Sequence, residues 1–235
     1  PVFMALTALG ILFGIGGGSF ISRQLGERKP ENACKASALC FWGSLGLGVL
    51  FLAAGLLLLP QLVTLLGASA ETYAFTLDYL RIILLGSPAI LLSNTLGQLI
   101  RAEGAAKCTM LGMMLGTVVN IALDPLFIFT LRMGVAGAAL ATAASPIVGM
   151  GINALHFRKK TNTLCFRWHK PTFKLLAHVS AVGVSGFIGE IAGGMTTMVL
   201  NFLILGLSGS IGVAAYGVVA NVAIVATAIF SGISQ

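Results

Sequence analysis

The sequence predicts an all-α, polytopic membrane protein. Of its 235 residues, 57% are hydrophobic and 9% are charged, whereas soluble domains carry about 25% charged residues. Four long stretches carry no charged residue at all, namely 36–70, 82–100, 133–157 and 191–235. A helix crosses the bilayer with roughly 18 to 20 apolar residues, so each stretch is long enough to span. The strands of an outer-membrane barrel would instead alternate polar and apolar residues.

Hydropathy and helix-breaking residues predict six membrane spans and an incomplete seventh. The expected spans are 1–21, 36–60, 76–100, 107–130, 134–156, 178–206 and 211–235. Because the chain opens on Pro1 and stops inside an uncharged stretch, we expect it to be an internal fragment of a longer protein. Its 30 glycines indicate helices that approach one another closely or bend within the membrane.

The connections between spans alternate in basic content, and this alternation predicts their orientation. Four Lys and Arg residues lie in 22–35, two in 101–107 and six in 158–174, whereas the other set of connections carries only Arg132. Cytoplasmic connections are the basic ones, so the first set is predicted to be cytoplasmic. The net charge of +7 comes from basic clusters that border the membrane spans, where they are attracted to anionic lipid. No nucleic-acid partner is therefore expected.

All four cysteines fall at or near the predicted cytoplasmic face. Cys34, Cys40, Cys108 and Cys165 are far apart in sequence and none belongs to a CxxC pair. Because cytoplasmic thiols are kept reduced, we expect four free thiols and no metal site.

A polar pair lies inside the fourth predicted span, where ionisable groups are costly and rare. Asn120 and Asp124 are one helical turn apart and therefore share a face of the helix. Pro125 has no N–H, so the carbonyl of Ile121 loses its helical partner and can accept a cation or water. These groups predict a Na⁺ or proton site. The alternative is that Asp124 pairs with Arg132 or caps a broken helix.

Thr142, on the next predicted span, is expected at a similar depth. With the connection near Arg132 outside the cell, Asp124 lies about 8 residues before it and Thr142 about 10 residues after it, at 1.5 Å of rise per residue. The Thr142 hydroxyl can therefore complete the cation site. The alternative is a hydrogen bond to its own i−4 carbonyl.

Glu190 is the second candidate, because it is the only charged residue in 175–235. Removal from water favours the neutral form of a carboxyl group, which suits a proton carrier or a counter-ion for a cationic substrate. A structural hydrogen bond to a neighbouring helix is the alternative.

Five methionines either line an adaptable pocket or fill space against lipid and neighbouring helices: Met110, Met113, Met114, Met195 and Met198.

Four segments resemble the multidrug and toxic compound extrusion (MATE) family. They are GGGSFISRQLG at 16–26, RAEG at 101–104, NIALDPLFI at 120–128 and GVAGAALAT at 134–142. Their order and spacing are similar to those of the family over residues 1–160, and the match is looser beyond Pro171. The Asn-x-x-x-Asp-Pro stretch followed by Gly-x-x-Gly-Ala-Ala is the most specific of these features.

The resemblance implies a twelve-helix transporter with two six-helix lobes, of which this chain covers helices two to seven and part of helix eight. Residues 1–157 would form most of the amino-terminal lobe, 158–174 the cytoplasmic connection, and 175–235 the start of the carboxy-terminal lobe. Where the amino lobe of family members binds a cation, an Asp of helix one joins Asn and Asp of helix five and a polar residue of helix six. Asn120, Asp124 and Thr142 match the last three, and Glu190 resembles a helix-seven carboxylate tied to coupling.

The implied function is a secondary active antiporter of the cell inner membrane, monomeric when full length. It would export cationic amphipathic compounds in exchange for Na⁺ or H⁺, with no cofactor besides the coupling ion. A lipid-linked oligosaccharide flippase of related fold is the alternative, but its cavity is usually more basic, whereas the candidates here are acidic. The spans hold no nucleophile and base, and no set of metal ligands, so we do not expect an enzyme.

Overall fold

The computed structural model describes residues 2–66, 73–158, 162–167 and 173–234, and these are helical apart from short connections. The elements are α1 (Val2–Gly26), α2 (Pro30–Leu57), α3 (Leu59–Leu65), α4 (Tyr73–Ala102), α5 (Ala106–Pro125), the π-helical segment η1 (Leu126–Thr130), α6 (Gly134–Ala154), the 3-10 segment η2 (Leu155–Arg158) and α7 (Phe173–Ser234). The all-α prediction is confirmed.

Six helical segments are long and apolar enough to cross a membrane, and they coincide with the first six predicted spans. The helix ends differ from the predicted ones because hydropathy locates the apolar core rather than the caps. The second helix starts at Pro30 instead of residue 36, with Pro at its first turn, where the missing N–H costs nothing. The short α3, which begins next to Pro60, was not expected as a separate helix.

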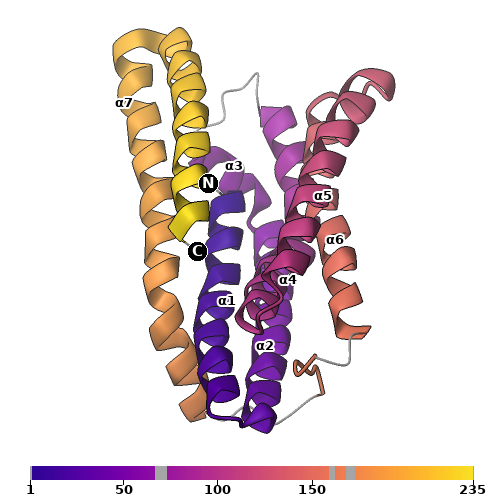
Figure 1. Cartoon of the computed structure of the whole chain (residues 1–235). Helices are drawn as coiled ribbons and strands as arrows, with labels where there is room; N and C mark the ends of the chain where they lie inside the picture. The colour runs from indigo at the N-terminus through magenta and orange to yellow at the C-terminus, as the bar shows by residue number, and fades with distance from the viewer. Residues whose placement is uncertain (1, 67–72, 159–161, 168–172, 235) are drawn as a thin grey trace. The chain divides into compact units, whose positions relative to one another are not determined.

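The chain packs as two units, Val2–Glu190 and Ile191–Gln235, so that α7 contributes to both. The sixth candidate span, Phe173–Ile204, crosses from the first unit into the second. Within the second unit, Figure 1 shows the helix reversing direction. The predicted boundaries between lobes and connection, at 157/158 and 174/175, stay predictions.

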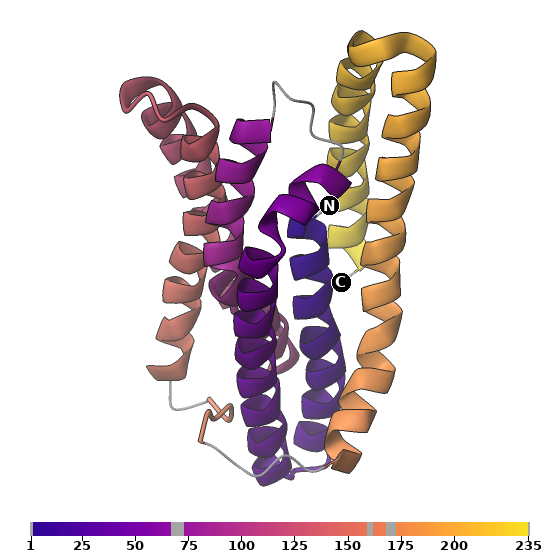
Figure 2. The same cartoon turned by 180° about the vertical axis from the view of Figure 1, so that it is seen from behind.

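Helix α4 is the central element of the first unit. It packs against α1, α2 and α6 and also contacts α3 and α5. Figure 1 shows α5 on the near face of this bundle, and Figure 2 shows α2 on the opposite face. The α4 side chains that pack inward include the buried Leu84, Ile90, Leu91 and Leu99. The central position of α4 fixes the places of the helices that carry the candidate site.

The helices of this unit approach one another at small residues. A methyl group added at Gly48 of α2 would lie 2.7 Å from the Pro88 Cα of α4, and one added at Gly86 of α4 would lie 2.9 Å from the Cβ of Ala143. Such contacts are closer than side chains allow and characterise helix interfaces in lipid. The prediction drawn from the glycine content is therefore confirmed.

The basic connections share one end of the first unit, as the predicted orientation requires. Ser22, near the end of α1, donates to the carbonyl of Ala102 at the end of α4. At the same end, the Trp42 indole donates to the carbonyl of Phe166 in the connection. We call this end, formed by 22–35, 101–107 and the described residues of 155–174, the basic end. Three lysines that are predicted to be cytoplasmic lie outside the described residues, namely Lys159, Lys160 and Lys170.

The prediction of four free thiols is wrong for two of them. Cys34, at the start of α2, forms a disulfide with Cys165 across a sequence separation of 131 residues, and their Cα atoms are 4.9 Å apart. Ser37 holds the two segments together, because its hydroxyl donates to the Cys165 carbonyl (2.9 Å) and accepts from the Cys165 N–H (3.0 Å). The spacing of the cysteines in the sequence carries no information about this proximity. Cys40 and Cys108 are free.

Replacing Cys165 with Ser should lower the free energy of unfolding in detergent by about 2–4 kcal/mol, because a long loop is then no longer closed in the unfolded chain. Chemical denaturation of the oxidised protein measures this loss. Cys108→Ser is the matched control and should leave stability unchanged. If Cys165→Ser and the unsubstituted chain are equally stable under oxidising conditions, the disulfide does not form.

Candidate functional site

Asn120 and Asp124 lie on one face of α5 near its end, as predicted. Both side chains are partly buried. The Asn120 Nδ2 atom is fully buried and has no hydrogen-bond partner among the described residues. The two ends of an amide are chemically distinct but interchange by a 180° rotation. This face of α5 therefore holds a buried polar group that still requires a partner, one turn from a carboxylate.

Thr142 lies on α6, which runs antiparallel to α5 and approaches it closely. A methyl group at Gly116 would lie 2.9 Å from the Ser145 carbonyl oxygen, and one at Gly112 would lie 3.0 Å from the Gly149 carbonyl oxygen. Continuing this antiparallel register by one helical turn brings Asn120 level with residues 141 and 142. The helices thus bring Asn120 and Thr142 to the same depth, with Asp124 one turn nearer the connection.

The helix changes geometry directly after Asp124 and Pro125. Residues Leu126–Thr130 form a π-helical turn, in which the Leu131 N–H donates to the Leu126 carbonyl at 2.9 Å. Single π-helical turns are frequent at functional sites. Among the described residues, Asp124 forms no ion pair with Arg132. The alternative explanation by that pair is therefore not supported.

Glu190 lies on α7 at the end of the first unit and is partly buried. The first part of α7 packs against α1, because methyl groups added at Gly16 or Gly183 would collide with the carbonyls of Val179 and Leu12. Asn120 and Asp124 belong instead to the α5–α6 pair. The candidates thus lie on two helix pairs of the unit, with Asn120, Asp124 and Thr142 on α5 and α6 and Glu190 on α7.

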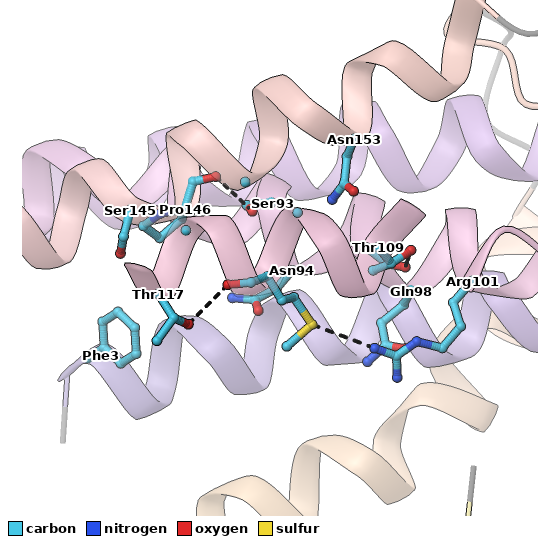
Figure 3. Close-up of a pocket in the computed structure, with 15 residues that line it drawn as sticks. Phe3, Ser93, Asn94, Gln98, Arg101, Thr109, Thr117, Ser145, Pro146 and Asn153 are labelled. Carbon is cyan, nitrogen blue, oxygen red and sulfur yellow. Dashed lines mark hydrogen bonds between the residues drawn. The ribbon is translucent and has the colours of Figure 1, made fainter. Parts of the chain in front are cut away.

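A cavity of about 320 Å³ lies between α4, α5 and α6, with Phe3 of α1 at one end and Arg101 at the other (Figure 3). Its remaining lining is Ser93, Asn94, Gly97, Gln98, Thr109, Gly112, Met113, Gly116, Thr117, Ser145, Pro146, Gly149 and Asn153. Of the five methionines considered above, Met113 is in this lining. Asn120 and Asp124 do not line the cavity; they lie one and two turns beyond Gly116.

The lining includes several uncharged polar side chains, and some of them are already hydrogen-bonded. Figure 3 shows Ser93 donating to the Pro146 carbonyl at 3.1 Å, and the Thr117 hydroxyl donates to the Met113 carbonyl at 3.0 Å. Asn153 is 3% exposed and its Oδ1 has no partner among the described residues. This cavity was not predicted from the sequence, although Ser93, Asn94 and Gln98 form a polar cluster within one predicted span.

A second missed feature is a buried polar cluster at the basic end. The side chains of Glu103 and His156 are each 4% exposed, and the Glu103 Oε2 lies 2.6 Å from the His156 Nε2. The other carboxylate oxygen accepts hydrogen bonds from both the backbone N–H and the hydroxyl of Thr163. Glu103 therefore joins the α4–α5 turn, the end of α6 and the connection.

The turn at Gly104 positions this carboxylate. Gly104 has a φ of +91°, which favours glycine because a Cβ would be strained there. Its N–H donates to the Arg101 carbonyl, and the Ala105 N–H donates to the Ile100 carbonyl, the pattern of a Schellman motif. The RAEG segment is thus a helix end that places Glu103 against the connection.

Comparison with known proteins identifies the family. Residues 1–126, more than half of the chain, match the model of the MatE family. The chain belongs to this family. It is 37% identical over 220 residues to multidrug export protein MepA of Staphylococcus saprophyticus, a match that covers 93% of this chain and 49% of that protein. The chain thus spans about half the length of the relatives it matches.

Two solved structures of MATE family transporters of the MOP superfamily are equally similar in fold. An inward-facing conformation gives a TM-score of 0.84 at 33% identity, covering 92% of this chain and 50% of that one. An outward-facing conformation also gives 0.84, at 31% identity, covering 96% and 51%. Family membership and the six apolar helices make this a multi-pass integral membrane protein, of the inner membrane in bacteria. The predicted resemblance is confirmed.

Replacing Glu103 with Ala should release the connection at Thr163, because its N–H and hydroxyl lose their shared acceptor. A hydrogen bond to a charged group contributes about 1.5–3 kcal/mol, so amide exchange in 162–167 should accelerate by roughly tenfold or more in the reduced protein. Hydrogen–deuterium exchange detected by mass spectrometry measures this. Glu31→Ala, at an exposed position of α2, is the control, and equal exchange in both variants would contradict the assigned role.

Proposed function

We propose that the protein containing this chain is a secondary active antiporter that exports cationic amphipathic compounds in exchange for Na⁺ or H⁺. The observation that carries the proposal is the polar face of α5. Asn120 has a buried amide nitrogen with no partner among the described residues, Asp124 follows one turn later, and Thr142 of α6 is level with Asn120. An intramembrane carboxylate with such neighbours is a functional-site candidate.

Coupling follows from the cost of an unpaired charge in the membrane. A carboxylate inside the membrane requires a compensating positive charge, which a bound Na⁺ or a proton would supply at Asp124. Oxygen ligands suit a hard cation, and the Asn120 amide and the Thr142 hydroxyl offer two besides the carboxylate. A site that must exchange one positive charge for another couples cation entry to release of a cationic substrate.

The substrate would be recognised by shape and charge together. A cavity of about 320 Å³ is near the lower limit for drug-sized ligands, and it presents both methionine and amide groups. Glu190 would serve as counter-ion for the substrate or as proton carrier. Two of the relatives are named multidrug export proteins, which supports export of several small molecules. We further propose that the full-length protein is a monomer with no cofactor besides its coupling ion.

A lipid-linked oligosaccharide flippase is the second candidate. Arg101 at one end of the cavity favours it, because a guanidinium pairs well with phosphate. The acidic side chains Asp124 and Glu190 within the spans favour the antiporter, since they would repel an anionic substrate.

The test is transport of a fluorescent organic cation by the full-length protein in proteoliposomes, driven by a Na⁺ or a proton gradient. Asp124→Asn should abolish gradient-driven exchange, and Glu190→Gln should weaken cation binding together with its pH or Na⁺ dependence. Asp78→Asn, at an exposed position of α4, is the control and should transport normally. Transport by Asp124→Asn at the rate of the unsubstituted protein would refute the proposal, as would uptake that responds to neither gradient.

A further inference from the structure

A second cavity lies at the basic end of the first unit, between α1, α2 and the start of α7. Its volume is about 360 Å³, and it is lined by Phe20, Asn32, Lys35, Lys174, Leu175 and His178. None of these residues belongs to the site proposed for coupling or export. This combination of basic, amide and apolar groups is suited to an anionic ligand with an apolar part.

The charges of this cavity are of one sign. Lys35 and Lys174 are exposed, and neither forms an ion pair within the described part of the chain. The lining contains no carboxylate. Glu27, in the turn before α2, is already bound by Lys29 at 3.0 Å and by Arg23 at 3.6 Å. The hydrogen bond from Lys29 and its charge lower the pKa of Glu27, so this carboxylate stays with its own partners.

Two helices begin beside the cavity, which adds to its positive potential. Helix α2 starts at Pro30 and contributes Asn32 and Lys35, while α7 starts at Phe173 and contributes Lys174 and His178. The N-terminus of a helix carries a partial positive charge and favours phosphate. Lysines from two helix starts therefore surround a single space.

The depth of the cavity indicates a lipid. Phe20 is at the end of the predicted span 1–21, and His178 is the first residue of the predicted span 178–206, so both lie at the edge of the apolar core. Their rings meet edge to face at 5.5 Å. Phe20 and Leu175 give the cavity an apolar side. Basic pockets between membrane helices on the cytoplasmic side bind the head groups of anionic lipids.

We propose that this cavity binds the phosphate group of an anionic phospholipid, with Lys35 and Lys174 pairing with the phosphate and Phe20 and Leu175 contacting the glycerol and upper acyl chain. The bound lipid joins the start of α2 to the start of α7. It thereby fixes the point where the connection re-enters the membrane.

Native mass spectrometry of the chain in detergent tests the proposal, with phosphatidylglycerol, phosphatidylcholine and soluble glycerol phosphate as probes. The chain should bind phosphatidylglycerol in preference to the other two. The double variant Lys35→Gln, Lys174→Gln should weaken that binding about 25-fold, since each lysine near the membrane surface contributes roughly fivefold in affinity. Lys35→Arg with Lys174→Arg should retain it.

The matched control is Lys107→Gln with Arg158→Gln, which removes two exposed charges from the same end without touching the cavity. This control should bind phosphatidylglycerol as the unsubstituted chain does. Equal loss in the control and the cavity variant would overturn the proposal, as would equal binding of phosphatidylglycerol and phosphatidylcholine. Binding of soluble glycerol phosphate as tight as that of phosphatidylglycerol would overturn the assignment to a lipid.

Discussion

The close approach of α5 and α6 at glycine is the constraint on which the candidate site depends. In lipid the hydrophobic effect does not drive helices together, so packing of small residues and hydrogen bonds between helices must do so. Gly112 and Gly116 of α5 lie against Gly149 and Ser145 of α6 with no room for a methyl group. That contact fixes the register of the two helices, and the register brings Asn120 and Thr142 to one depth.

At the basic end, three different kinds of interaction hold the described connection residues 162–167 to the helices of the first unit. The Glu103 carboxylate binds His156 and Thr163, the disulfide joins Cys34 to Cys165, and the Trp42 indole binds a connection carbonyl. These contacts fasten the described residues 162–167 to α2 and to the α4–α5 turn.

The sequence alone predicted the parts of the molecule that follow from periodicity and charge. Uncharged stretches located six spans, the spacing of Asn120 and Asp124 placed them on one face, and basic residues identified the end shared by their connections. What could not be predicted depends on contacts between distant segments. The pairing of Cys34 with Cys165 and that of Glu103 with His156 each join residues more than fifty positions apart. No local pattern encodes them.

The helix ends and the cavity show the same limit at shorter range. Hydropathy does not distinguish the apolar core of a helix from its polar first turn, so the start of α2 at Pro30 was missed. The polar residues Ser93, Asn94 and Gln98 were visible in the sequence, but only the packing of α4 against α5 and α6 shows that they face a common space. A polar cluster inside a predicted span therefore indicates a polar cavity, just as an intramembrane carboxylate indicates a candidate site.

The stability of two valine variants on α6 tests the central constraint most directly. A methyl group added at Gly149 would lie 3.0 Å from the Gly112 carbonyl oxygen, whereas one added at Gly151 would meet nothing within 4 Å. Both positions are helical, so the change in helix propensity is shared. Gly149→Val should lower the free energy of unfolding in detergent by about 1–3 kcal/mol, and Gly151→Val should change it by no more than about 0.5 kcal/mol. Equal stability of the two variants would contradict the dependence of the α5–α6 register on glycine.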